Sequence, residues 1–123
     1  MPTSFDRQNI FAAPHARVVA HEGVGQIDFS RIVESGALVG GVNFIDHAVL
    51  PPGASIGRHR HGDAEEELYL VLTGEGLMFR DGEVFTVRRG DLIRNLPGGT
   101  HGLQNVGDVP LEIFVIELRT ESR

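Results

Sequence analysis

Short apolar stretches alternate with glycine and proline turns along most of the chain. Few windows carry the i, i+3, i+4 spacing of apolar positions that indicates an amphipathic helix. Short strands at regular intervals, with turn residues between them, are typical of an all-β sandwich or barrel. The strands that this pattern predicts are Arg17–His21, Gln26–Ile32, Val42–Leu50, Ser55–His61, Leu68–Thr73, Leu77–Arg80, Glu83–Val87, Asp91–Asn95, Gly102–Asn105 and Leu111–Leu118.

Turn residues separate several of these strands. Pro51-Pro52-Gly53 is expected to end a strand, because proline lacks the amide proton that a sheet requires. Asp81-Gly82 predicts a two-residue hairpin turn, since both residue types tolerate a positive φ. The glycines of residues 33–41 predict a flexible loop. The turns therefore divide the chain into strands of the length found in small barrels.

The segment Leu68–Leu72 is apolar at every position. A strand with one face in water would alternate apolar and polar residues. We therefore expect the outer face of this strand to be covered by another sheet, by the N-terminal arm or by a second subunit. A homodimer is the expectation that follows.

The chain has 123 residues, which is enough for one domain with a single core. Residues 1–16 are expected to form an N-terminal arm, and residues 17–123 the β-barrel domain. Cysteine and lysine are absent, which excludes disulfides, cysteine-ligated metals, thiol nucleophiles and Schiff-base lysines. The net charge of -6 and the scattered arginines argue against a nucleic-acid partner, which would require a basic face.

No apolar run approaches the length of a membrane span, and no signal-peptide pattern is found at the N-terminus. A cytoplasmic protein without a membrane partner is therefore expected.

Histidines and carboxylates cluster in the middle of the sequence. Alternate side chains of a strand point the same way, so His59 and His61 share one face. Two imidazoles at this spacing can converge on one metal ion. The run Glu65–Glu67 follows directly after a polar turn, and His101 comes after a glycine turn at the start of another strand. Three imidazoles and one carboxylate suit a first-row divalent metal better than calcium or magnesium.

Two motifs carry a resemblance to a known family. The first consists of Gly53, His59, His61, a glutamate and Gly74, and the second consists of Gly90, Pro97, Gly98, His101 and Asn105. In residue type, order and spacing, these motifs resemble those of the cupins. In its size, the chain resembles the small bacterial cupins that consist of one type-2 barrel. The resemblance implies an all-β fold, the double-stranded β-helix or jelly-roll barrel, in a single domain.

Two positions depart from the cupin pattern. Counting back from Gly74 selects Glu67 as the glutamate of the first motif, whereas counting on from His61 selects Glu65 or Glu66. We favour Glu67, because the preceding loop can absorb an extra residue, whereas a register slip within the strand would reverse every side chain. In the second motif Leu96 stands where cupins have proline, and Pro97 follows one position late.

The resemblance implies a site for one divalent transition metal, Mn, Fe, Ni, Zn, Co or Cu, held by His59, His61, Glu67 and His101. A small-molecule ligand with adjacent oxygens, such as a carboxylate, a hydroxy or keto acid, an enol or a catechol, would bind beside the metal. The side chains that we expect to form the apolar wall of this pocket are Tyr69, Val71, Phe79, Leu103 and Phe114.

Two functions remain open at this point. A dioxygenase, decarboxylase or isomerase would use the metal to convert the ligand, and a sensor or carrier would only bind it. No further carboxylate or histidine has a spacing that demands acid–base catalysis. His15, His21 and His47 are interpreted as surface or core residues, with His47 the one considered for the pocket.

Overall fold

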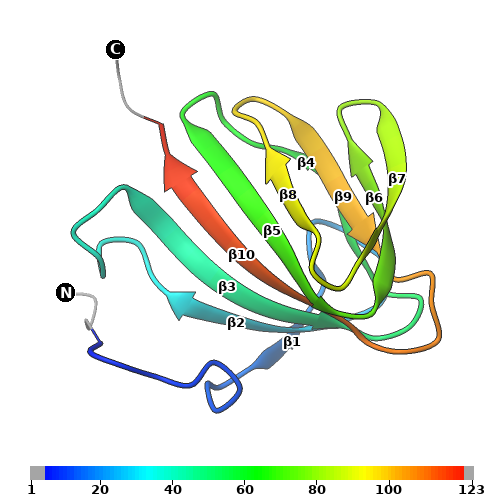
Figure 1. Ribbon diagram of the computed structural model, residues 1–123, viewed down its shortest axis with the longest axis horizontal. Coiled ribbons are helices and arrows are strands. Elements are labelled where there is room, and N and C mark those ends of the chain that lie inside the picture. The colour runs from blue at the N-terminus through cyan, green and yellow to red at the C-terminus, as the bar shows by residue number, and fades with distance from the viewer. Residues whose placement is uncertain (1–4, 121–123) are drawn as a thin grey trace.

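The computed structural model describes residues 5–120 and contains ten strands, shown in Figure 1. Because β-branched and aromatic residues alternate with polar ones between glycine turns, these segments fold as strands. The strands are β1 (Ala16–Val18), β2 (Ile27–Val33), β3 (Val42–Leu50), β4 (Ser55–Arg60), β5 (Glu65–Thr73), β6 (Glu75–Arg80), β7 (Glu83–Arg88), β8 (Leu92–Asn95), β9 (Thr100–Gln104) and β10 (Leu111–Arg119).

The strands form two antiparallel sheets that face each other. One sheet has six strands in the order β1-β2-β3-β10-β5-β8, and the other has four in the order β4-β9-β6-β7. This arrangement confirms the predicted all-β jelly-roll barrel. The hairpin turn at Asp81-Gly82 is also confirmed, since both residues have a positive φ, of 48° and 84°.

Most strands differ from their predicted bounds by one or two residues, and the differences at β5 and β1 affect the candidate site. Strand β5 begins at Glu65, before the apolar run, because Glu65, Glu66 and Glu67 pair with the end of β10. Strand β1 ends at Val18, earlier than predicted, and a separate parallel bridge then joins Ala20 to Ile56. Thus the glutamate run belongs to the large sheet, and the chain after β1 reaches the edge of the small sheet. The division at residue 16 between arm and barrel stays a prediction.

One end of the barrel is filled by apolar side chains. Leu50 at the end of β3 and Leu111 at the start of β10 are paired and fully buried. Met78 and Leu103, which are paired across β6 and β9 in the facing sheet, are buried as well. The opposite half of the barrel, towards the start of β3 and the end of β10, contains most of the buried polar side chains. That half holds the candidate site.

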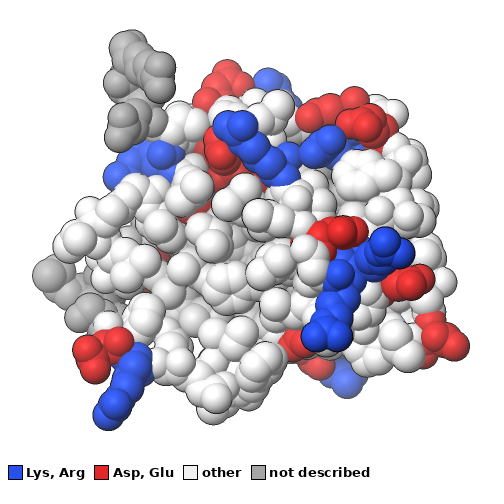
Figure 2. Space-filling model, in the orientation of Figure 1, with Lys and Arg blue, Asp and Glu red and all other residues white. Residues whose placement is uncertain are grey.

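The outer face of the six-stranded sheet is apolar where β5 and β10 lie side by side. Leu68, Leu70, Phe114 and Ile116 are neither buried nor fully exposed there. Figure 2 shows this face, over β3, β10 and β5, with few charged side chains near its middle. The N-terminal segment contacts His47 on β3. A second subunit over β5 and β10, the predicted homodimer, stays a prediction.

Gly74, the last glycine of the first motif, is expected to be intolerant of a side chain. Its φ is +87°, and a Cβ at this position would overlap the Pro110 carbonyl group. Gly74→Ala should therefore lower the free energy of unfolding by at least about 3 kcal/mol, measured by urea denaturation with circular dichroism.

Gly53 supplies the matched control for this substitution. Its φ is +84°, but no atom lies within 4 Å of the position of a Cβ. Gly53→Ala should therefore cost only the strain of the left-handed conformation, about 1 kcal/mol. Equal losses of stability in the two variants would contradict the predicted clash at Gly74.

Candidate metal centre

Four side chains from three strands or their ends meet inside the open half of the barrel. His59 on β4 and His101 on β9 are direct partners in the small sheet, and His61 follows the end of β4. Glu67 projects from β5 in the facing sheet. One ligand atom from each of these four residues lies within 4.8 Å of the others. The structure thus brings together the four residues that the sequence selected.

The spacing of these atoms matches that of ligands around one ion. The Nε2 atoms of His59 and His61 are 3.1 Å apart. Glu67 Oε1 lies 3.1 Å from His101 Nε2 and 3.5 Å from His61 Nε2. Ligand atoms about 2.1 Å from a metal and at right angles to each other are about 3.0 Å apart. The donor set and its geometry therefore fit a divalent transition metal.

The hydrogen bonds of His59 and His61 favour tautomers with the proton on Nδ1, which leaves Nε2 free to bind a metal. His59 Nδ1 donates a hydrogen bond of 2.8 Å to the Gly57 carbonyl, so the neutral ring carries its lone pair on Nε2. His61 Nδ1 lies 3.1 Å from Glu117 Oε1, an acceptor that favours the proton on this nitrogen. Two neutral rings in these tautomers would direct lone pairs at each other across 3.1 Å. A cation at that position converts the repulsion into coordination.

The electrostatics of the cluster favour the metal-binding forms of Glu67 and His59 and oppose that of His61. Burial alone would raise the pKa of Glu67, but hydrogen bonds from His101 and His61 outweigh it and lower the pKa to about 2. Burial lowers the pKa of His59 to about 4, so this imidazole is neutral at physiological pH. The hydrogen bond to Glu67 instead raises the pKa of His61. His61 is thus a ligand that must lose a proton before a metal can bind.

Glu67 has the position that counting back from Gly74 in the first motif favoured. Glu67 is 4% exposed and faces the barrel interior, as does Tyr69 two residues on. Glu66 points to the outer face and pairs with Arg94. Glu65 lies beside His61, with its Oε2 atom 3.6 Å from Nδ1. The alternation along β5 therefore separates Glu67 from the glutamate that faces outward.

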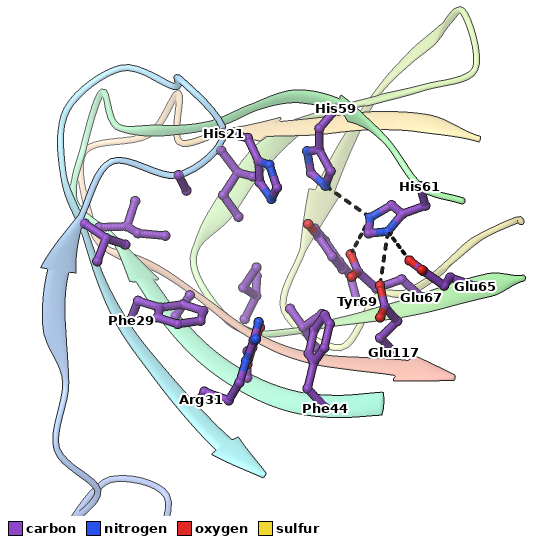
Figure 3. A pocket seen from close by; sticks show the side chains of 18 of the residues that line it. His21, Phe29, Arg31, Phe44, His59, His61, Glu65, Glu67, Tyr69 and Glu117 are labelled. Carbon is purple, nitrogen blue, oxygen red and sulfur yellow. Dashed lines mark hydrogen bonds and ion pairs between the residues drawn. The ribbon is translucent and has the colours of Figure 1, made fainter. Parts of the chain in front are cut away.

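A cavity of about 570 Å³ extends from the candidate metal centre between the two sheets. Figure 3 shows His59 and His61 on one side of it and Arg31, Phe44 and Phe29 on the other. This volume is in the range of sites that bind small organic molecules. The residues that line it are Val18, Val19, Ala20, His21, Ile27, Phe29, Arg31, Phe44, Asp46, Ala48, Ile56, His59, Arg60, His61, Gly62, Glu65, Glu67, Tyr69, Ile113, Val115 and Glu117.

Four of the five residues predicted for the apolar wall lie outside this lining. Tyr69 lines the cavity as expected, with burial raising the pKa of its hydroxyl well above the ordinary value. Val71 and Leu103 face inward but lie deeper, in the packed end of the barrel. Phe79 and Phe114 are on the outward faces of β6 and β10, where Phe79 packs under the Arg58 guanidinium at 4.1 Å.

Several polar residues of the cavity were not identified from the sequence. Glu117 on β10 is directly paired with Glu67, and burial raises the pKa of its carboxyl. Arg31 and Asp46 are directly paired on β2 and β3. The His21 ring stacks on the His59 ring with centroids 3.5 Å apart, because the bridge at Ala20 brings this segment against β4. Strand alternation could have revealed Glu117, two positions after the inward Val115.

The other two histidines that the sequence left as surface or core residues lie away from the cavity. His47 is buried on the outer face of β3, where its Nε2 atom is 2.6 Å from Glu112 Oε2. His15 Nε2 lies 2.7 Å from His47 Nδ1, and the Phe11 ring packs edge-on against His47. These contacts attach the N-terminal segment to the large sheet.

Asn95 is a buried amide beside the centre. It is 2% exposed and directly paired with Glu67 across β5 and β8. Neither polar atom of its side chain has a hydrogen-bond partner among the residues that the structure describes. Buried amides in folded proteins are normally hydrogen-bonded. A bound water or ligand group next to Glu67 would satisfy this one.

Comparison with known proteins identifies the family. The sequence profile of the Cupin domain family matches residues 46–117, which is more than half of the chain. The chain belongs to the cupin family. Among residues 5–120, no helix is long and apolar enough to cross a membrane.

A curated relative and a solved structure, both from Thermotoga maritima, are similar to this cupin. It is 29% identical over 94 residues to an oxalate-binding protein, covering 76% of this chain and 77% of the relative. The crystal structure of a predicted oxalate decarboxylase superposes with a TM-score of 0.86 at 25% identity, covering 90% of this chain and 96% of the other.

A sugar phosphate isomerase of the cupin superfamily from Silicibacter pomeroyi is more distant. It superposes with a TM-score of 0.74 at 19% identity, covering 94% of this chain and 76% of the other. At this identity the likeness extends to the barrel fold alone.

Proposed function

We propose that this cupin holds one divalent transition metal at His59, His61, Glu67 and His101 and binds a small oxygenated acid beside it. The observation that carries the proposal is the convergence of three imidazole nitrogens and one carboxylate oxygen within 4.8 Å. An octahedral ion held by these four residues would leave two positions for oxygens of a ligand. It would supply Lewis acidity towards a carboxylate, a keto or hydroxy acid, an enol or a catechol.

Two further observations support an acid as the ligand. The oxalate-binding protein covers three quarters of this chain, and its name describes a small diacid. Asn95, which is paired with Glu67, is a buried amide without a partner among the described residues and could hydrogen-bond a water or oxygen held next to Glu67. Manganese and iron are the first ions to test, because N/O donor sets of this kind accept both.

Chemical conversion of the bound acid is the second candidate function. The cavity contains Glu117, a carboxyl outside the four-ligand set whose pKa is raised by burial. A carboxyl whose pKa is raised holds its proton more readily than usual and is suited to proton transfer with a ligand bound in the same cavity. This group distinguishes the cavity from a simple binding site, and it favours a decarboxylase, dioxygenase or isomerase over a carrier.

Removing the metal is the experiment that tests the first proposal. Titration calorimetry of oxalate, a catechol, a diketone and a keto acid should show binding to the Mn- or Fe-loaded protein. Protein stripped with a chelator should bind the same compound at least about tenfold more weakly, because the Lewis acid is gone. Equal binding with and without the metal, for every compound, would refute the proposal.

The same samples separate conversion from binding. NMR spectra of the mixtures should show product if Glu117 acts in catalysis, and Glu117→Gln should abolish the product while leaving the ligand bound. Tight binding without product under every metal would support the carrier instead.

A further inference from the structure

The cavity is larger than a two-carbon acid requires. Oxalate bound at the metal centre would leave most of the volume of about 570 Å³ unfilled. The rest of the lining is partly apolar and includes Ala48, Ile113 and Val115, and Figure 3 shows Phe29 and Phe44 across the cavity from His59 and His61. A ligand that fits this space has an apolar segment in addition to its metal-binding oxygens.

The positively charged side chain of Arg31 lies at the far side of this cavity. Arg31 rises from β2 on the wall that faces His59 and His61 (Figure 3). The pairing of the sheet places it in one row with Asp46, Val115 and Tyr69 on the next three strands. Arg31 therefore lies across the cavity from His59 and His61. A ligand that binds at the metal centre and also contacts Arg31 has to span this cavity.

Its neighbours hold the Arg31 guanidinium in place without using all its donors. Arg31 stacks on the Phe44 ring at 4.0 Å, and its Nε and Nη2 atoms donate to Asp46 at 2.9 and 3.2 Å. No acceptor for Nη1 is found among residues 5–120. The side chain remains 44% exposed. The guanidinium thus keeps a free edge with the paired donors that bind a carboxylate or phosphate in bidentate fashion.

The other arginine of the lining is less suited to this role. Arg60 is 68% exposed at the rim, donates to the Gly98 carbonyl and pairs with Asp63. The ion pair with Asp46 uses one edge of the Arg31 guanidinium. It does not account for the position of the guanidinium in the cavity lining, close to the rings of Phe29 and Phe44. The stacked, half-anchored guanidinium is a preorganised anion site.

We propose that Arg31 binds an anionic group at the far end of the ligand, which makes the ligand a keto or hydroxy acid with a second carboxylate beyond an apolar segment. This inference rests on the proposed function, because the near end of the same ligand occupies the metal centre. Phe44 positions the guanidinium, and Asp46 sets its orientation. The second carboxylate determines specificity, since a monoacid of the same length leaves the Arg31 edge without a partner.

Matched pairs of ligands test the inference on the Mn-loaded full chain. α-Ketoglutarate is compared with α-ketovalerate, and α-ketoadipate with α-ketocaproate, with oxalate as a ligand too short to reach Arg31. Calorimetry should show at least one diacid binding about tenfold or more tightly than its monoacid, the gain expected from a charged, bidentate hydrogen bond. Equal affinities within both pairs would overturn the inference and leave the proposed function standing.

The variant for this test replaces both charges of the Arg31–Asp46 ion pair, so that neither is left unpaired. Arg31→Gln alone would leave Asp46 as an unpaired buried charge, so Arg31→Gln is combined with Asp46→Asn. The double variant should lose the preference for the diacid, bind oxalate within about twofold of the unmodified chain and retain its metal content. A preserved preference would also overturn the inference. Failure of oxalate and all four keto acids to bind the loaded, unmodified chain would refute the proposed function and this inference with it.

Discussion

Replacing Glu67 by glutamine is expected to weaken Mn(II) binding by at least about 100-fold, because it removes the one anionic donor of the cluster. Loss of a residue that only orients a ligand commonly costs 10- to 100-fold in affinity, so loss of a ligand itself should cost more. The substitution hardly changes the shape of the side chain. Affinity is measured by calorimetry or by competition with a chelating dye, and metal content by elemental analysis.

The two neighbouring glutamates provide matched controls. Glu66→Gln should leave the affinity within about twofold, because Glu66 pairs with Arg94 on the outer face of the sheet. Glu65→Gln should have an intermediate effect, since Glu65 lies beside His61 Nδ1. An effect at Glu66 equal to that at Glu67 would mean that β5 is shifted in register. His59→Ala should reproduce the loss seen for Glu67→Gln.

Much of the barrel could be predicted from local sequence signals. Glycine and proline turns bound the strands, and alternation within them indicates which side chains share a face. His59 and His61 could therefore be placed on one face, and His101 was added through the resemblance to the cupins. Its direct pairing with His59 became apparent only in the structure. The start of β5 was missed because three consecutive glutamates resemble a solvated turn, whereas Glu67 is stabilised by the histidines around it.

The wall of the cavity could not be predicted as well, for a physical reason. Alternation tells whether a side chain points inward, but not how deep along the barrel it lies. Val71 and Leu103 point inward and are part of the packed end, not of the cavity. Arg31 and Glu117 carry charges that a single sequence assigns to solvent by default. Only the pairing of strands distant in the sequence brings them to the open half of the barrel.

Acid is expected to release the metal, and His61 sets where the release begins. The hydrogen bond to Glu67 raises the pKa of His61 above its ordinary value of 6.5, against the effect of burial, and the charge of Glu117 raises it further. A proton on His61 excludes the metal, so the affinity is constant at high pH and falls as the pH drops through this pKa. Below it, each pH unit should cost at least about tenfold in affinity, because at least one proton competes with each ion.

The other two shifted ligands do not contribute until the pH is much lower. The pKa of His59 is about 4 and that of Glu67 about 2, so both keep their metal-binding forms while His61 takes up its proton. Glu117→Gln removes a charge that raises the pKa of His61, and should therefore move the onset of metal loss to lower pH. Calorimetric titrations of Mn(II) across the pH range, for the unmodified chain and this variant, measure both effects. An onset that moves to higher pH in the variant, or an affinity independent of pH, would exclude His61 as the ligand that controls binding.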